Sequence, residues 1–209
     1  MVSATMASPL LRTIQPAYAP CEHFGGVCRE MRWSPPDGHV PRGFCGALGD
    51  VGEVELVLVS AEPGDPLRGE AHTGLESAVE YSLSSLRRRA TPFHQNIRLI
   101  LDLCFPNLSF DEQLRRTWRT DLVLCSAKVE CGGVPRSVER TCMSAYLSRQ
   151  LALVPNALVA ALGRKAQDRL RRQGIRFFAA AHPASRKSNE VKHASWKALA
   201  QELRRHPSV

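Results

Sequence analysis

The chain has no apolar run long enough to cross a membrane, and its start, MVSATMASPLLRTIQPAYAP, lacks a basic segment followed by an uninterrupted apolar one. It also has no internal repeat and no low-complexity block. These absences argue against a membrane protein and a repeat protein. We therefore expect a soluble, monomeric protein of the cytoplasm, associated with the nucleoid if the source is bacterial.

Acidic residues are few relative to basic ones, with 20 Asp and Glu against 28 Lys and Arg, which gives a formal charge of +8. Most of the positive charge comes from arginine, whose guanidinium binds oxyanions through a fixed fork of donors. This composition favours a nucleic acid as partner over an acidic protein. A basic but otherwise inert enzyme surface is the alternative.

The length of 209 residues suits one domain with a substantial core, so we expect a single domain over 1–209. Residues 1–54 are rich in Pro and Gly and show little periodicity, which predicts an irregular N-terminal arm over that domain. Residues 55–209 alternate short apolar runs with amphipathic segments. Strands are predicted at 55–61, 121–126, 156–163 and 176–181, and helices at 74–89, 93–104, from 109, and at 136–153, 164–173 and 188–205.

Strands that alternate with helices in this way predict a parallel sheet, because parallel neighbours need crossover connections. The fold class is therefore α/β, a three-layer α/β/α sandwich around a four-stranded parallel sheet. In such a sheet the ligand crevice lies beyond the carboxyl ends of the strands.

Polar residues follow three of the four predicted strands. The first strand ends at Ala61-Glu62-Pro63-Gly64-Asp65, the second at Ser126-Ala127-Lys128, and the fourth at His182-Pro183-Ala184-Ser185-Arg186. We expect these three ends to share one crevice, with two acids and a histidine among them. The alternatives are a surface turn with solvated carboxylates and a structural histidine.

These segments resemble the uracil-DNA glycosylase superfamily, especially its family 4 members, which carry an iron-sulfur cluster. The segment His182-Pro183-Ala184-Ser185-Arg186 is similar to the family's His-Pro motif. Residues 60–64 parallel its Gly-Glu-Ala-Pro-Gly motif with the acid one place later, and residues 162–166 resemble its Leu-Gly-x-x-Ala segment. The resemblance implies an enzyme that flips uracil out of single- or double-stranded DNA, hydrolyses the N-glycosidic bond and releases free uracil.

The resemblance also implies roles for the site residues. His182 would donate a hydrogen bond to the leaving base, and Glu62 and Asp65 compete for the role of the acid that orients water. Phe93 looks like the aromatic residue that stacks on the flipped base, although as an isolated residue it also suits the core. Further substrate contacts are expected from Ala61, Gly64, Ser185 and Arg186.

The family's asparagine after the second strand, which reads the uracil edge, is missing here. Ser126 or Ala127 stands in its place, with Lys128 close by. This departure leaves room for the same fold to act on another deaminated or damaged base. A non-catalytic iron-sulfur or zinc protein that binds nucleic acid through its arginines is the rival from a different class.

The seven cysteines form an odd set, which in a reducing compartment is typical of buried thiols or metal ligands. The resemblance implies a [4Fe-4S] cluster bound by Cys21, Cys28, Cys131 and Cys142. Four thiolates also suit a structural zinc, and the absence of any metal is a third possibility. Cys45 is the reserve ligand, and Cys104 and Cys125 are predicted to be core thiols.

Overall fold

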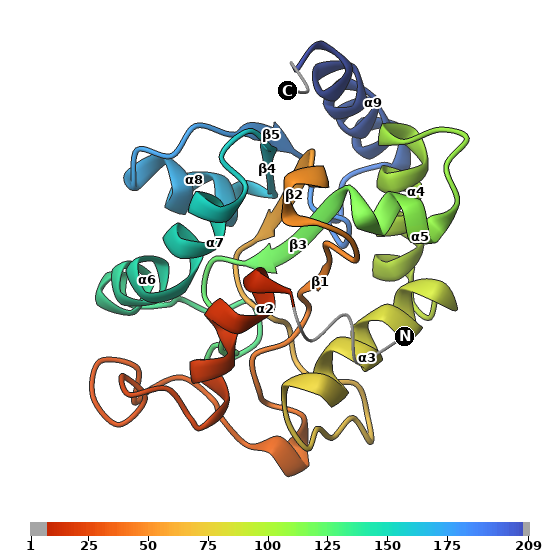
Figure 1. Cartoon of the computed structure of the whole chain (residues 1–209). Coiled ribbons are helices and arrows are strands. Elements are labelled where there is room, and N and C mark those ends of the chain that lie inside the picture. Colours follow the sequence, from red (N-terminus) through yellow and green to blue (C-terminus); the bar gives the residue numbers. More distant parts are fainter. Residues whose placement is uncertain (1–7, 207–209) are drawn as a thin grey trace.

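The computed structural model describes residues 8–206, and at its centre lies a sheet with the strand order β1-β3-β2-β4-β5 (Figure 1). The strands are β1 (Cys45–Gly46), β2 (Leu56–Ser60), β3 (Thr117–Asp121), β4 (Leu158–Leu162) and β5 (Phe178–Ala180). Four of them, β3, β2, β4 and β5, are parallel, which confirms the predicted four-stranded parallel sheet. The fifth, β1, adds a short antiparallel pairing to β3 at one edge.

The central strand β2 is buried on both faces. Its residues alternate between two apolar clusters, with Val57 and Val59 in one and Leu56 and Leu58 in the other. This alternation follows from the period of two in a strand. Both faces of the sheet therefore carry a core, as a parallel sheet in an α/β sandwich requires.

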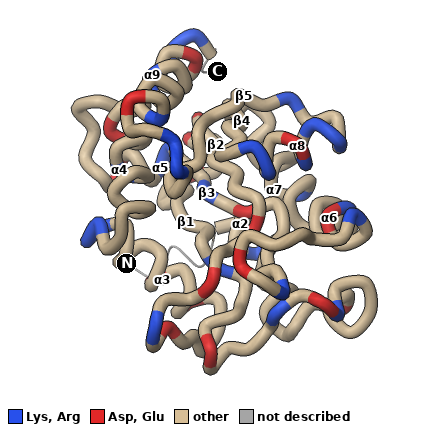
Figure 2. The backbone as a smooth tube through the Cα atoms, turned by 180° about the vertical axis from the view of Figure 1, so that it is seen from behind, with Lys and Arg blue, Asp and Glu red and all other residues tan. Residues whose placement is uncertain are grey.

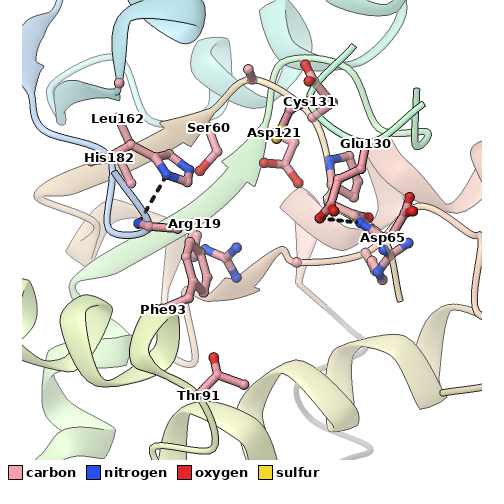
Figure 3. Close-up of a pocket in the computed structure, with 18 of the residues that line it drawn as sticks. Ser60, Asp65, Thr91, Phe93, Arg119, Asp121, Glu130, Cys131, Leu162 and His182 are labelled. Atoms are coloured by element: carbon pink, nitrogen blue, oxygen red, sulfur yellow. Dashed lines mark hydrogen bonds between the residues drawn. The ribbon is translucent and has the colours of Figure 1, made fainter. Parts of the chain in front are cut away.

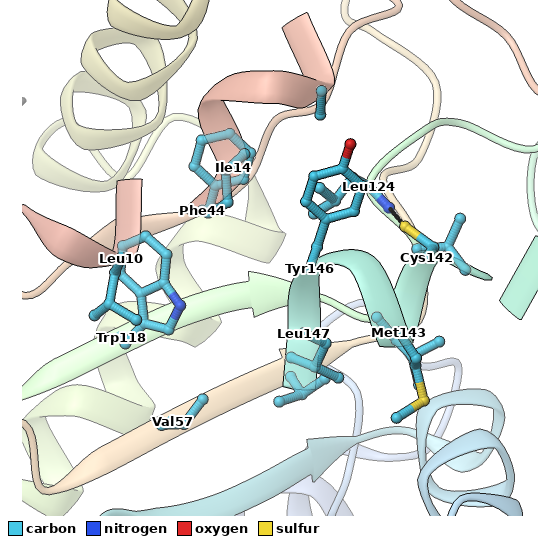
Figure 4. Close-up of a cluster of buried hydrophobic side chains, with 14 of the residues drawn as sticks. Leu10, Ile14, Phe44, Val57, Trp118, Leu124, Cys142, Met143, Tyr146 and Leu147 are labelled. Atoms are coloured by element: carbon cyan, nitrogen blue, oxygen red, sulfur yellow. Dashed lines mark hydrogen bonds between the residues drawn. The ribbon is translucent and has the colours of Figure 1, made fainter. Parts of the chain in front are cut away.

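Helices cover each face (Figure 1). The cluster around Val57 includes Trp118, Phe44 and side chains from several helices (Figure 4). Those helices are α2 (Pro9–Ile14), α6 (Arg136–Cys142), the π-helical segment Met143–Leu147, α7 (Ser148–Leu153) and α8 (Arg164–Arg172). The opposite face is covered by α4 (Pro92–Cys104), α5 (Phe110–Arg115) and α9 (Asn189–Arg205). Helix α3 (Leu75–Arg87) contributes to both clusters.

The N-terminal arm is more ordered than its composition predicts. It contains α2, β1 and short 3-10 turns at Gln15–Tyr18, Pro35–Asp37 and Val51–Glu53. Leu10, Leu11 and Ile14 of α2 are fully or almost fully buried in the core. A helix of six residues is too short to show periodicity in the sequence, so the pattern missed it. Residues 1–7 of the predicted arm lie outside the described residues.

The second parallel strand lies earlier than predicted. The sequence predicted a strand at 121–126, whereas β3 spans Thr117–Asp121. The apolar residues after it are buried in a loop whose first amides still bond to the end of β2, with Leu122 N–H donating to Ser60 O at 2.9 Å and Val123 N–H to Ala61 O at 3.0 Å. The apolar run therefore predicted burial correctly but not the strand. The strand end that faces the crevice is Asp121 and not Ser126.

Most helix boundaries follow the predicted signals. Ser109 caps α5 in a capping box with Glu112, as its sequence SFDE predicts.

The arginines at the end of α3 form ion pairs within the protein. Arg87 pairs with Asp111 at 2.7 Å, and Arg89 pairs with Asp102 at 3.2 Å. Figure 2 shows further basic positions along α8 and at the end of α9. Among the described residues, no helix has the length and apolarity needed to cross a membrane.

Candidate active site

A cavity of about 460 Å³ opens at the carboxyl ends of the parallel strands (Figure 3). Ser60 ends β2, Asp121 ends β3, Leu162 ends β4 and His182 follows β5, and all four line the cavity. This is the position at which a parallel α/β sheet binds its ligand.

The cavity contains some of the predicted site residues and excludes others. Glu62, Asp65 and His182 line it, as do Ala61, Gly64 and Phe93. The remaining predicted substrate contacts are absent from its described lining: Ser126, Ala127, Lys128, Ser185 and Arg186.

These exclusions have a physical reason. Ser126 and Ala127 are buried behind the loop that carries Gly64, and the Ser126 hydroxyl donates to Gly64 O at 3.4 Å. Lys128 and Arg186 are exposed outside the cavity. Ser185 turns back on its own loop, where its N–H donates to the His182 carbonyl at 2.9 Å.

His182 is held in one tautomer by its own loop. The Ala184 N–H donates to Nδ1 of His182 at 3.2 Å, so Nδ1 is an acceptor and the proton of the neutral ring lies on Nε2. Burial, with a smaller contribution from Arg119, lowers the pKa of His182 to about 4. At neutral pH the ring is uncharged and presents an Nε2–H donor.

Phe93 lies in the first turn of α4 and forms part of the cavity wall. Its ring centroid is 5.8 Å from that of His182, and the guanidinium carbon of Arg119 lies 4.9 Å from it. The ring also packs against the buried cluster that contains Ile97. Phe93 is thus both a cavity residue and a core contact, so the two readings of the sequence are compatible.

The two acids of the first loop have different surroundings. Glu62 is almost buried, and its carboxylate pairs with Arg169 Nη1 at 2.5 Å and with Lys165. Arg169 in turn pairs with Glu139 at 2.8 Å. Glu62 therefore belongs to an ionic network that joins the end of β2 to α6 and α8. Its charge is already neutralised within the protein.

Asp65 is the more available acid. Its side chain is 41% exposed and its nearest charged partner is Arg32, whose Nη1 lies 3.3 Å away. The Asp65 N–H donates to the carboxylate of Glu130 at 3.1 Å, which ties this loop to the segment after β3 (Figure 3). Of the two predicted acids, Asp65 is the more exposed to a substrate or a water.

Arg42 of the N-terminal arm supports this loop from behind. Its guanidinium donates to the Gly64 carbonyl and lies 3.2 Å from the Ser126 hydroxyl. Its Nε pairs with buried Glu70 at 3.2 Å, and Glu70 also contacts His72 Nε2 at 2.9 Å. The arm thus positions the loop that carries Asp65.

The comparison with known families agrees with this geometry. A family model described as the uracil DNA glycosylase superfamily matches residues 48–204, about three quarters of the chain. The chain belongs to the uracil DNA glycosylase superfamily. Membership implies a DNA glycosylase, a hydrolase that removes damaged bases from DNA. No curated protein matches the chain.

Arg119 and Asp121 are among the polar residues of this glycosylase cavity that sequence reasoning missed. Both project from β3 toward the cavity and both are buried (Figure 3). Their segment, Thr117–Asp121, is largely polar, so an apolar-run criterion passes over it. The alternation of β-branched, aromatic and charged residues in TWRTD was the signal that could have found the strand.

The cysteines are arranged differently from the set that the superfamily resemblance implied. A second, small cavity is lined by Cys21, Cys28, Cys125 and Cys142. Cys131, the predicted ligand, is exposed and lines the active-site cavity instead. Cys125, predicted to be a core thiol, lines the small cavity, because β3 ends at Asp121 and the loop after it begins five residues earlier than expected. Cys45 and Cys104 belong to the buried cluster on the opposite face of the sheet.

The thiols at the small cavity influence one another. Burial raises the pKa of Cys28 to about 11 and that of Cys142 to about 12, with the neighbouring thiols adding to both shifts. Within residues 8–206, no group of three or more His, Cys, Asp or Glu side chains is close enough to hold a metal ion as it stands. The donor set is nevertheless four thiols at one cavity, the ligand number and type of an iron-sulfur or zinc site.

Proposed function

We propose that this glycosylase removes uracil from DNA by hydrolysing its N-glycosidic bond. The observation that carries the proposal is the placement of an Nε2–H donor, an aromatic ring and an open carboxylate around one cavity of about 460 Å³. A base must leave the stack before its glycosidic bond is accessible, and such a cavity accepts a flipped nucleotide. Phe93 would contact the face of the base and offset part of the cost of unstacking.

His182 would act on the leaving base. As the bond breaks, negative charge develops on the uracil, and a positioned donor stabilises that charge. A neutral imidazole suits this role, because its Nε2–H donates without having to lose a proton at neutral pH. The Ala184 N–H at Nδ1 keeps the ring in the donating tautomer.

Asp65 would face the sugar and the attacking water. An ionised carboxylate both orients a water and stabilises the positive charge that develops on the sugar. Glu62 is less suited, because Arg169 and Lys165 already neutralise it. Its proposed role is to hold the loop that carries Asp65.

We further propose that Cys21, Cys28, Cys125 and Cys142 hold a [4Fe-4S] cluster, which would anchor the N-terminal arm to the loop after β3 and to α6. Four cysteines from three separate segments at one cavity support this assignment. A structural zinc bound by the same thiols is the second candidate. No step of the reaction is assigned to the cluster.

The decisive experiment is cleavage of single- and double-stranded oligonucleotides that contain one uracil, followed by alkali treatment to break the strand at abasic sites. Strand breaks at the uracil and release of free uracil support the proposal. Matched oligonucleotides with hypoxanthine, xanthine or cytosine test the alternative that another base is the substrate. Tight DNA binding without release of any of these bases would favour the non-catalytic rival.

A further inference from the structure

The floor of the active-site cavity contains polar groups whose hydrogen-bonding capacity is not used. Within the described part of the chain, Ser60 Oγ, Arg119 Nε and Asp121 Oδ2 are buried and have no hydrogen-bond partner. The three residues are 3%, 8% and 2% exposed and all line the cavity. Ser60 and Asp121 lie directly opposite one another in the register of β2 and β3. Buried polar groups are costly unless paired, so this cluster is suited to a polar ligand.

Asp121 is the unusual member, because a carboxyl group at this position is hard to ionise. Burial raises the pKa of Asp121 to about 7, with the nearby Glu62 charge adding to the effect and Arg119 opposing it. No ion pair joins Asp121 to a cation within residues 8–206. A substantial fraction of Asp121 is therefore a neutral carboxylic acid at physiological pH.

The groups around Asp121 come from every element that packs against it. Arg42 and Arg169 are already paired with Glu70, Glu62 and Glu139. Arg119 is the remaining cation, and its guanidinium lies over the Phe93 ring. The titratable and charged groups that face Asp121 are Arg119 on β3, Glu62 after β2, Arg42 and Cys45 near β1, Cys142 on α6 and Arg169 on α8.

We propose that Asp121, as a neutral carboxylic acid, reads the hydrogen-bonding edge of the flipped base, and that its ligands are bases with an N–H beside a carbonyl. A carboxylic acid offers one acceptor and one donor in a single plane, which matches the N3–H and O4 of uracil. The inference rests on the proposed glycosylase function and names the residue that selects the base.

The ionised form of Asp121 would be unfavourable in the same position. A carboxylate has only acceptors, so it would leave the base carbonyl facing a negative oxygen. It would also repel the negative charge that develops on the leaving base, in a buried site where charges are weakly screened. Arg119 alone would have to compensate for both effects. Base recognition should therefore weaken as Asp121 ionises.

Binding without catalysis isolates this role. The probe is single-stranded DNA with one non-cleavable 2′-fluoro-2′-deoxyuridine, compared with the same DNA carrying an abasic tetrahydrofuran, between pH 5.5 and 8.5. Above about pH 7 we expect the gain in affinity due to the base to fall by up to tenfold per pH unit, because binding requires one proton. Asp121→Asn, which keeps a donor and an acceptor but does not titrate, should make the gain constant.

Asp111→Asn is the matched control, since Asp111 is an exposed carboxylate on α5 outside the described lining of the cavity. It should reproduce the wild-type profile. A wild-type gain that does not change with pH, or an Asp121→Asn profile identical to wild type, would overturn the inference. Excision of cytosine that increases with pH would also overturn it, because the ionised carboxylate would then be the reading group.

Failure of the proposed function has a different signature. If the wild-type protein neither prefers the uracil nucleotide over the abasic one nor excises uracil at any pH, both proposals are wrong. If it excises uracil with no contribution from Asp121, only the inference is wrong.

Discussion

Gly163 and His182 approach so closely that a Cβ atom on residue 163 would lie 2.7 Å from the Cβ of His182. Gly163 also has a φ of +84°, which favours glycine. It precedes α8 directly, so this one residue allows the start of α8 and the loop that carries His182 to pack against each other.

Replacing Gly163 with Ala should therefore displace His182. We expect uracil excision under single-turnover conditions to slow at least tenfold, with little change in DNA affinity. Gly174→Ala is the matched control, because Gly174 has a φ of +70° but no neighbouring atom within 4 Å of the new Cβ. Both variants should lose about 1–2 kcal/mol of stability from the backbone strain. Equal excision rates in the two would show that the contact with His182 does not matter.

His182→Ala tests the donor directly. Loss of the imidazole donor should reduce transition-state stabilisation by about 2–4 kcal/mol, the free energy expected for one hydrogen-bond donor to a developing anion. DNA affinity should barely change. Because the pKa of His182 is lowered to about 4, wild-type excision should show no histidine-dependent loss between pH 8 and pH 5. A variant that binds DNA poorly but excises normally once bound would assign His182 a structural role.

Substitutions of Asp65 and Glu62 should affect different properties, the first the rate of excision and the second the stability of the fold. Asp65→Asn should slow single-turnover excision strongly and leave the free energy of unfolding within about 1 kcal/mol of wild type, since the Asp65 side chain is 41% exposed and its ion pair with Arg32 lies at the surface. Glu62→Gln should instead destabilise the fold by about 3 kcal/mol, because it removes one partner of buried Arg169. Denaturant unfolding and excision assays on both variants test this division. If Glu62→Gln is the slower enzyme at full stability, the roles are reversed.

The cysteine assignment predicts a brown protein. Cys125→Ser should bleach the visible absorbance and lower the iron content, whereas Cys131→Ser and Cys104→Ser should retain both. Cys131 is exposed at the active-site cavity, and Cys104 is a buried thiol of α4 on the other face of the sheet. A colourless protein with bound zinc would favour the zinc alternative. Bleaching by Cys131→Ser and not by Cys125→Ser would restore the ligand set that the sequence suggested.

Burial of Asp121 also has a consequence for stability. Its pKa is raised to about 7 in the folded protein, so the unfolded chain loses its proton at lower pH than the native state does. Relative to Asp121→Asn, wild-type stability should therefore decrease as pH rises from about 4 to 7 and stay constant above that. Thermal unfolding of the two proteins across this range measures the difference. Parallel curves would mean that Asp121 ionises normally.

The sequence predicted the position of an apolar strand correctly, whereas it misplaced the strand whose residues are largely polar. Val57 and Leu58 lie in a run that only a strand buried on both faces explains, and β2 lies where that run predicts. The predicted strand followed the apolar run at 121–126 and left out residues 117–120, because polar side chains such as Arg119 do not match an apolar-run criterion. This misplacement of the strand end then shifted the predicted substrate contacts to Ser126 and beyond.

The sequence also did not predict which residues far apart in the chain contact one another. The sequence placed Glu62 and Asp65 on one loop, but Arg169, the cation that pairs with Glu62, lies 107 residues further along the chain. In the same way, Cys125 and Cys131 both follow β3, and spacing alone does not tell which thiol turns inward. Local patterns predict elements, whereas these choices depend on how distant elements pack.

The contacts of Arg42 show that the active-site cavity depends on residues that precede the superfamily match. The superfamily match starts at residue 48, yet Arg42 and Gly43 line the cavity and Leu10, Leu11 and Ile14 fill the core. A shortened protein that starts at the family boundary would keep every proposed catalytic side chain and lose the guanidinium that holds the Gly64 carbonyl. Substitutions at these positions before residue 48 can therefore alter turnover without altering any residue of the matched region.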